Sequence, residues 1–250
     1  MAKTKIEWTD ITWSPVTGCT KISEGCQHCY GESIAKRFWG DRKFSDIRIH
    51  SDRILRPKFP KKPSRIFVCS MSDLFHKEIN DHQLGAILSV IRNNPQHTFQ
   101  ILTKRPERAL EWKDSLSSLP NIMLGVTTEN QAMYDARVPY LLQIDAKVRF
   151  ISIEPALGRV EICFDRDVGD PYNEGRLTYK GGIDWVIYGG ETGLRARKGV
   201  GCWAPDVWQD CKEAGIPFFF KGWGTAIMPK SHPKYHNIAP TTVCEEIPNL

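Results

Sequence analysis

The stretch Ile122-Met123-Leu124-Gly125-Val126-Thr127-Thr128-Glu129 shows the pattern that decides the fold: a short apolar run that ends in polar residues. The pattern recurs along the chain, at Ile66–Cys69, Phe99–Leu102, Val148–Ile153, Trp185–Tyr188 and Pro217–Phe220. Near-continuous hydrophobicity is typical of strands that are buried on both faces of a parallel sheet. With a first strand around Ile6–Trp13, the sequence predicts about seven strands.

Helical patterns follow most of these runs. Asp81 is expected to cap a helix over residues 82–93, and Pro106 and Pro205 each suit a first helical turn. Alternating strands and helices joined by right-handed crossovers form either a barrel or a doubly wound sheet. We predict an α/β fold, a parallel (β/α) TIM-like barrel that is partial or incomplete.

A single domain is expected over residues 1–250, because no Pro/Ser-rich linker divides the chain. The segment 164–182, rich in Asp, Gly and Tyr, interrupts the rhythm and is predicted to be a loop or hairpin insertion. The segment 229–250 shows little periodicity and is predicted to be an irregular C-terminal tail.

The composition favours a cytoplasmic protein. No run of about 18 apolar residues could span a membrane, and the polar N-terminal stretch does not resemble a secretory signal. In a reducing compartment, clustered cysteines indicate a metal site rather than disulfides. The net charge of +5 and the pI near 8.7 are compatible with a phosphate-bearing partner.

Three of the eight cysteines fall on one loop after the predicted first strand, Cys19, Cys26 and Cys29. Three thiolates can hold three irons of a [4Fe–4S] cluster and leave the fourth iron open. An open iron can chelate the amino and carboxylate groups of S-adenosylmethionine (SAM). The alternative is a zinc site with His28 or Cys69 as its fourth ligand, but no second C-x-x-C pair is present. We therefore favour the cluster.

The cysteine loop, its position and the barrel rhythm resemble the radical SAM superfamily, whose usual motif has three residues in the first gap where this chain has six. Other stretches are similar to a largely uncharacterised, phage-associated three-cysteine family: Thr12–Cys19, Ser70–Phe75, Ile153–Pro155, Gly189–Glu191 and Phe218–Gly224. Leu102-Thr103-Lys104 is similar to its counterpart in spore photoproduct lyases, which are radical SAM enzymes that repair DNA.

The resemblance implies that SAM lies across the strand ends beside the cluster. The candidate contacts are Ser70, Ser72 and Asp73 for the methionyl ammonium, Lys104 for the carboxylate, Thr127 and Glu129 for the ribose, and Tyr30 for adenine. Each has a structural alternative: Ser and Asp often cap helices, lysines are mostly solvated, and a tyrosine can simply contribute packing.

The remaining strand ends are expected to face the substrate. Glu154, Tyr188, Glu191 and Lys221 are the catalytic candidates, and Tyr188 or Cys202 could relay a hydrogen atom. Glu154 and Lys221 could instead form an ion pair across the rim. Arg105, Arg195 and Arg197 are candidate substrate contacts, because cations near exposed aromatics suit nucleic acids.

The sequence therefore predicts a radical SAM enzyme that cleaves SAM reductively and abstracts hydrogen from a substrate, with a nucleic-acid base or nucleotide as the first choice. An external electron donor such as flavodoxin or ferredoxin would supply the electron. Two alternatives stay open. One keeps the chemistry but acts on a small metabolite or peptide, and the other is a zinc-stabilised nucleic-acid-binding module without catalysis.

Overall fold

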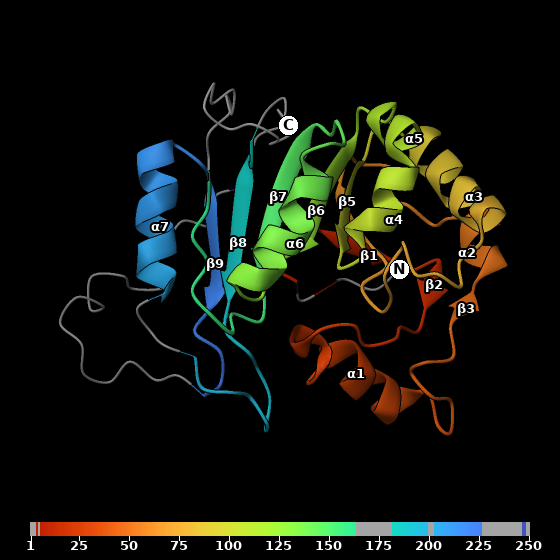
Figure 1. Cartoon of the computed structure of the whole chain (residues 1–250). Helices are drawn as coiled ribbons and strands as arrows, with labels where there is room; N and C mark the ends of the chain where they lie inside the picture. The colour runs from red at the N-terminus through yellow and green to blue at the C-terminus, as the bar shows by residue number, and fades with distance from the viewer. Residues whose placement is uncertain (1–3, 5, 164–181, 200–202, 227–246, 249–250) are drawn as a thin grey trace.

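The computed structural model describes residues 4, 6–163, 182–199, 203–226 and 247–248. Its main sheet has seven strands in the order β1-β4-β5-β6-β7-β8-β9, and every neighbouring pair is parallel. The strands are β1 (Ile11–Trp13), β4 (Arg65–Val68), β5 (Thr98–Thr103), β6 (Ile122–Thr127), β7 (Val148–Ile153), β8 (Trp185–Gly189) and β9 (Phe218–Gly222). The sheet curls into a half-barrel, so the predicted partial TIM-like barrel is confirmed (Figure 1).

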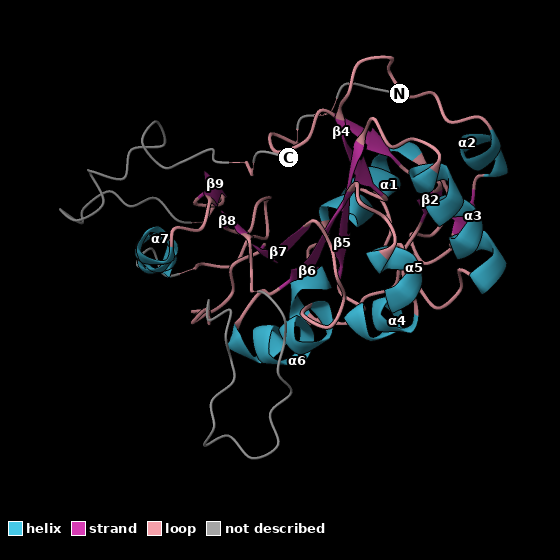
Figure 2. Cartoon of the chain, turned by 90° about the horizontal axis from the view of Figure 1, so that it is seen from above, coloured by secondary structure: helices cyan, strands magenta, loops and turns pink. Residues whose placement is uncertain are grey.

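Helices cover the outer face of the sheet, except for α1, which lies below the carboxyl ends of the strands (Figure 1). Figure 2 shows the strands in an arc with helices outside it. The helices are α1 (Tyr30–Phe38), α2 (Ser51–Leu55), α3 (Asp81–Arg92), α4 (Pro106–Glu111), α5 (Lys113–Ser117), α6 (Gln131–Leu141) and α7 (Trp203–Ala214). A short antiparallel pair, β2 (Val16–Thr17) with β3 (Arg48–Ile49), lies apart from the main sheet. None of the described helices is both long and apolar enough to cross a membrane.

One helix cap differs from the prediction. Asn80, not Asp81, is the N-cap of α3, and its side chain accepts a hydrogen bond from Gln83 N while the Gln83 side chain accepts one from Asn80 N. Such a reciprocal capping box satisfies two free backbone donors. Asp81 is the first residue of the helix, where its charge suits the positive end of the helix dipole.

Two apolar clusters hold the sheet. The larger lies between the strands and the outer helices, and the smaller fills the inside of the half-barrel. The inner cluster contains Trp8, Phe67, Met123, Val148, Phe150, Trp185, Ile187 and Phe219. Gly125 is needed here, because a Cβ at that position would lie 2.5 Å from the Phe150 ring. The barrel interior is therefore closed by aromatic side chains below the carboxyl ends of the strands.

Side chains alternate between the two faces along a strand, so the residues that follow the inner cluster also point inward. Lys104, Thr127, Glu154 and Lys221 continue this inward series at the carboxyl ends of β5, β6, β7 and β9. We call these four residues the inner rim. In parallel barrels, this end of the strands carries the functional groups.

The predicted insertion at 164–182 and the predicted tail at 229–250 lie almost wholly outside the described residues, as does Cys202. The single-domain organisation over 1–250 stays a prediction.

Candidate functional site

The cysteine loop, residues 18–29, lies beside the carboxyl ends of the strands, on the side of the sheet where α1 is found (Figure 1). Gly18 begins the loop with a φ of +101°, and a Cβ there would lie 2.4 Å from Asp46 O. Gly18 N donates to Met71 O at 2.9 Å, and Ser72 Oγ donates to Gly18 O at 2.6 Å. Ser72, a predicted SAM contact, thus anchors the start of the loop.

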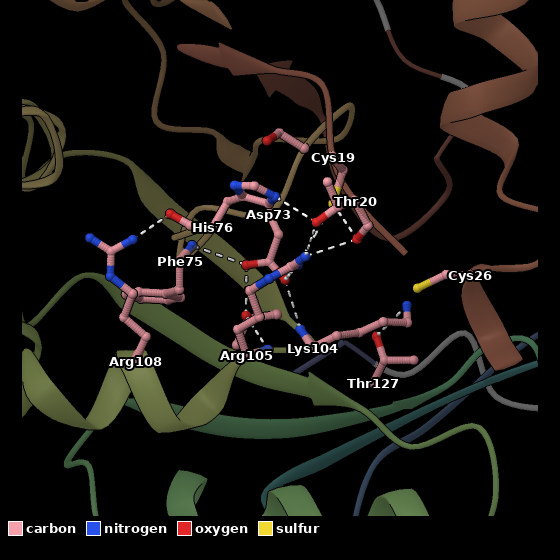
Figure 3. A network of polar contacts seen from close by, with 12 residues as sticks. Cys19, Thr20, Cys26, Asp73, Phe75, His76, Lys104, Arg105, Arg108 and Thr127 are labelled. Atoms are coloured by element: carbon pink, nitrogen blue, oxygen red, sulfur yellow. Dashed lines mark hydrogen bonds and ion pairs between the residues drawn. The ribbon is translucent and has the colours of Figure 1, made fainter. Parts of the chain in front are cut away.

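Asp73 is buried and accepts four hydrogen bonds (Figure 3). Its Oδ1 accepts from Phe75 N at 3.0 Å and Thr103 Oγ1 at 2.7 Å. Its Oδ2 accepts from Lys104 N and from Arg105 Nη1, each at 3.0 Å. This predicted SAM contact therefore joins the end of β4 to the end of β5 and fixes the Arg105 guanidinium.

Arg105 connects Asp73 to the cysteine loop. Its Nη1 lies 3.6 Å from Cys19 Sγ, and its Nη2 donates to Thr20 O at 2.8 Å (Figure 3). The Thr20 hydroxyl also lies 2.8 Å from Nε2 of the buried His76. Burial raises the pKa of the Cys19 thiol, although the nearby Arg105 charge acts in the opposite direction. Arg105 was predicted to contact substrate, and here it contacts the loop.

Glu129 makes the second link to the loop. It is fully buried, pairs with Arg137 Nη1 at 2.7 Å, and accepts hydrogen bonds from the Ser23 hydroxyl and from Gly25 N. A Cβ on Gly25 would lie 2.8 Å from Glu129 Oε1, so the contact requires glycine. Burial acts to raise the pKa of Glu129, but Arg137, Ser23 and Lys104 outweigh it and hold the pKa below its ordinary value.

Glu191 and Arg197 make the third link. Arg197 Nη2 lies 2.5 Å from Glu191 Oε1 and donates to Glu24 O at 3.0 Å, while its Nη1 donates to Gln27 Oε1 at 3.2 Å. His28 Nδ1 lies 3.2 Å from Glu191 Oε2. Burial acts to raise the pKa of Glu191, but the hydrogen bonds from Arg197 and His28 lower it to about 2.

The cysteine loop is thus held by three carboxylate–arginine pairs, whose carboxylates follow the alternate strands β4, β6 and β8. Each pair includes one residue that was predicted to contact SAM or to act in catalysis, namely Asp73, Glu129 and Glu191. Arg137, Ser23 and Thr20 were not predicted, and no pattern in the sequence marks them as partners of the loop.

Lys104 extends from the inner rim toward the cysteine loop. Its Nζ donates to Thr127 Oγ1 at 3.3 Å, and Figure 3 shows its side chain reaching toward Cys26. Burial acts to raise the pKa of the Cys26 thiol, but a hydrogen bond with the backbone of Ile22 and the Lys104 charge bring that pKa below its ordinary value. A lowered pKa favours the thiolate, the form of cysteine that binds metal.

The other half of the inner rim is an ion pair. Lys221 Nζ lies 2.9 Å from Glu154 Oε1, with 43% of the lysine side chain exposed and 18% of the glutamate side chain. Ser152 Oγ donates to Glu154 Oε2 at 3.4 Å. Tyr188, the fourth catalytic candidate, lies on the opposite face of the sheet, where it stacks on Phe220. The structure therefore brings Glu154 and Lys221 together and separates Tyr188 from them.

Tyr30 and Ser70 lie next to each other beside the cysteine loop. The Tyr30 hydroxyl donates to Ser70 O at 2.5 Å, and the Ser70 hydroxyl lies 3.3 Å from Ser14 Oγ. About half of the Tyr30 side chain is exposed. Tyr30 borders the cysteine loop, because it directly follows Cys29, and its hydrogen bond brings Ser70 to the same place.

The basic residues near the strand ends differ in whether their side chains are engaged in contacts with the protein or face solvent. Arg105 and Arg197 are occupied by the links above, and Arg108 donates to the carbonyls of His76 and Ile79. Arg195 is exposed on the loop after β8. Of the three predicted substrate contacts, Arg195 is therefore the one whose side chain faces solvent.

The three cysteines of the loop are free and partly exposed. Among the described residues, no group of three or more His, Cys, Asp or Glu side chains is arranged to hold a metal ion. The donor set nevertheless suits an iron–sulfur cluster chemically, because three unpaired thiols share one loop and one of them has a lowered pKa. Cys69 and Cys211 are buried, and Cys163 is exposed at a distance in sequence.

The half-barrel and its loop define a parallel β/α protein with three thiols beside the carboxyl ends of the strands. The chain belongs to the family described as a protein of unknown function, DUF5131, whose model matches residues 3–240. No curated protein sequence matches the chain.

Two solved structures of spore photoproduct lyase variants are similar to this chain, each with 14% sequence identity. One, with bound AdoMet and dinucleoside spore photoproduct, has a TM-score of 0.43 over 62% of this chain and 48% of that chain. The other has a TM-score of 0.45 over 75% of this chain and 57% of that chain. The chain thus covers about half the length of these lyases.

Proposed function

We propose that this protein is a radical SAM enzyme in which Cys19, Cys26 and Cys29 hold a [4Fe–4S] cluster. The observation that carries the proposal is the position of the three free thiols, on one loop beside the inner rim of a parallel half-barrel. Parallel barrels carry their chemistry at this end. Three thiolate ligands also leave one iron of a cluster free to bind a further molecule.

Bound together, the cluster and SAM would supply a one-electron cleavage and a radical that abstracts hydrogen from the substrate. Lys104 is the residue that we assign to the SAM carboxylate, because its ammonium lies beside Thr127 and has no ion-pair partner among the described residues. We also assign Thr127, Ser70 and Tyr30 to SAM, because Thr127 bonds Lys104 and the Tyr30 hydroxyl bonds Ser70 O beside the cysteine loop. Asp73, Glu129 and Ser72 position the cysteine loop. We therefore propose that they support SAM binding indirectly, by holding the loop, and not by direct contact with SAM.

Glu154 and Lys221 are the residues that we assign to the substrate side. Their pairing places the carboxylate next to an ammonium whose other hydrogens remain available, because much of the Lys221 side chain is exposed. Such a pair can orient a polar substrate, and the aromatic inner cluster beneath it excludes water. The substrate must therefore approach at the rim rather than enter the barrel.

A nucleic-acid base or nucleotide is the substrate class that we propose to test first. The support is the exposed pair of cations on the loop after β8, Arg195 and Lys198, together with the net charge of +5. The contrasting proposal is a small metabolite or peptide, which needs the Glu154–Lys221 pair but not these exposed cations. The likeness to a phage-associated family stays a prediction.

The test is anaerobic reconstitution with iron and sulfide. We expect about four irons and four sulfides per chain, because three thiolates suffice for a cluster with one open iron. Replacing Cys19, Cys26 or Cys29 with Ala should abolish the brown colour and the visible absorption, while Cys163→Ala serves as the matched control and should keep both.

Two results would overturn the proposal. One is a full-strength cluster in the Cys19→Ala protein, which would show that the loop is not the ligand. The other is stoichiometric zinc without iron in protein purified anaerobically, which would support the zinc-stabilised module instead. Cleavage of SAM to methionine and 5′-deoxyadenosine by the reduced protein, stimulated by DNA or RNA, would support both the enzyme and its substrate class.

A further inference from the structure

Arg105 is the arginine of the three loop links that contacts a cysteine sulfur. Its Nη1 donates to Asp73 Oδ2 at 3.0 Å and to Cys19 Sγ at 3.6 Å, so one nitrogen serves the carboxylate and the sulfur together (Figure 3). In the part of the chain that the structure describes, Arg137 and Arg197 donate to oxygens alone. A guanidinium stays protonated in proteins, so this contact brings a permanent positive charge to Cys19.

The sulfurs of the other two cysteines have no charged donor in hydrogen-bond contact among the described residues. Ser23 Oγ lies 3.8 Å from Cys26 Sγ, but its single hydroxyl hydrogen is donated to Glu129. A Cys26 thiolate can therefore receive no hydrogen bond from Ser23. The Lys104 ammonium acts on Cys26 through its charge, without a hydrogen bond to the sulfur. Cys19 thus differs from the other two cysteines of the loop.

The guanidinium of Arg105 is held in one position and shielded from water. The side chain of Arg105 is 13% exposed and that of Asp73 is 8% exposed. Arg105 Nη2 donates to Thr20 O at 2.8 Å, which fixes the group from the side of the loop. Asp73 is in turn held by three further donors, so neither charge is free to turn away. Charges that are buried in this way are screened much less by salt than exposed ones.

We propose that Arg105 raises the reduction potential of the cluster through its hydrogen bond to Cys19, and that Asp73 limits this effect. The inference rests on the proposed function, because it concerns the cluster that Cys19 would hold. One-electron reduction adds one negative charge to the cluster and its thiolates. A positive donor at a ligand sulfur stabilises the reduced form more than the oxidised form, and a neighbouring carboxylate does the reverse.

A purely structural role of the pair gives a different expectation, since both residues also hold the cysteine loop. Loss of either residue breaks the same ion pair and the same connection between the strand ends and the loop. If the pair only held the loop, both losses would change the potential in the same direction. If the charges act on the cluster, loss of Arg105 lowers the potential and loss of Asp73 raises it. The sign of the two shifts therefore separates the two roles.

The experiment is a redox titration of the full-length, reconstituted protein with dithionite and mediators. The electron paramagnetic resonance of the reduced cluster reports the fraction reduced at each potential, and iron and sulfide are measured alongside. The variants are Arg105→Gln and Asp73→Asn, which remove one charge each and keep a polar side chain. The matched control is Arg197→Gln, which breaks another carboxylate–arginine link to the loop but removes no hydrogen bond to a sulfur.

We expect Arg105→Gln to make one-electron reduction about tenfold less favourable, because a charge-assisted hydrogen bond is lost. For a one-electron couple this corresponds to a potential about 59 mV below that of the parent. Asp73→Asn should shift the potential in the opposite direction, because Arg105 then lacks its counter-charge. Arg197→Gln should shift the potential less than Arg105→Gln does.

An unchanged or raised potential in Arg105→Gln, or shifts of the same sign in both variants, would overturn the inference and leave the proposed function standing. Where a variant takes up no cluster, the parent protein labelled with the heavy nitrogen isotope in its arginines decides. Coupling of an arginine nitrogen to the reduced cluster in pulsed electron paramagnetic resonance supports the inference, and absence of that coupling overturns it. A parent protein that takes up no cluster overturns the proposed function and the inference together.

Discussion

The buried pair between Glu129 and Arg137 offers a sharp test of how the cysteine loop is held. The Glu129 side chain is fully buried and the Arg137 side chain is 5% exposed. Replacing Glu129 with Leu would leave the arginine charge buried without a partner, which costs about 3–5 kcal/mol. For a chain of this size each kcal/mol lowers the melting temperature by about 2–4 °C. We therefore expect Glu129→Leu to melt about 6–20 °C below the parent.

The double variant Glu129→Leu/Arg137→Met separates the effect of the pair on the stability of the fold from its effect on the position of the cysteine loop. Apolar replacement of both partners removes both buried charges, so the double variant should be more stable than either single variant. Its cluster content should nevertheless stay low, because Ser23 and Gly25 have still lost their acceptor.

The assay is thermal and urea unfolding of the two single variants and the double variant, with iron content measured alongside. The control is Arg159→Met in the exposed pair with Glu161, which should change stability by less than about 1 kcal/mol. Additive losses in the double variant would refute the buried-pair reasoning. Full cluster content in the same variant would refute the role of Glu129 in holding the loop.

Three further outcomes are expected. The pKa of Glu191 falls from its ordinary 4.5 to about 2 on folding, so the parent should lose stability as the pH falls from about 4.5 to 2 in an acid titration. The Glu191→Gln variant should lose less stability over the same pH range. Gly25→Ala should lower the iron content by crowding Glu129, whereas Gly85→Ala, with its nearest neighbour at 3.7 Å, should not. Lys104→Ala should weaken SAM binding roughly 10- to 100-fold in a calorimetric titration while the cluster stays intact.

The sheet could be predicted from the sequence because its strands are buried on both faces. Each apolar run from Ile66 onward is a strand whose ends lie within two residues of the prediction. The prediction of the first strand was less accurate. It was expected over Ile6–Trp13, but only Ile11–Trp13 forms the strand and pairs with β4. The β2–β3 pair was missed, because two-residue strands have no periodicity to detect. Short elements of this kind depend on tertiary contacts rather than on local sequence.

The site was harder to predict for a physical reason. Carboxylates and arginines at strand ends suit a bound cofactor, but the same residues also suit the unpaired backbone groups of an irregular loop. A sequence gives the position of Arg105 after β5, yet not the 3.0 Å contact that commits it to Asp73. Which partner a charged group finds depends on the approach of chain segments that are tens of residues apart.

The arrangement of the three pairs has a mechanical explanation. The cysteine loop contains one short 3-10 helix, Glu24–Cys26, and otherwise lacks regular structure, so its own backbone cannot fix the thiols. One carboxylate–arginine pair lies beside each cysteine: the pair after β4 contacts Cys19, the pair after β6 contacts the residues before Cys26, and the pair after β8 contacts the residues before Cys29. The carboxylates of these pairs follow strands that are hydrogen-bonded in register within one sheet, so the sheet sets where each carboxylate meets the loop. The carboxylates that hold the loop thus stand after alternate strands. The intervening strands β5, β7 and β9 carry Lys104, Glu154 and Lys221 at their ends, which we assign to bound molecules, and Arg105 after β5 also contacts the loop.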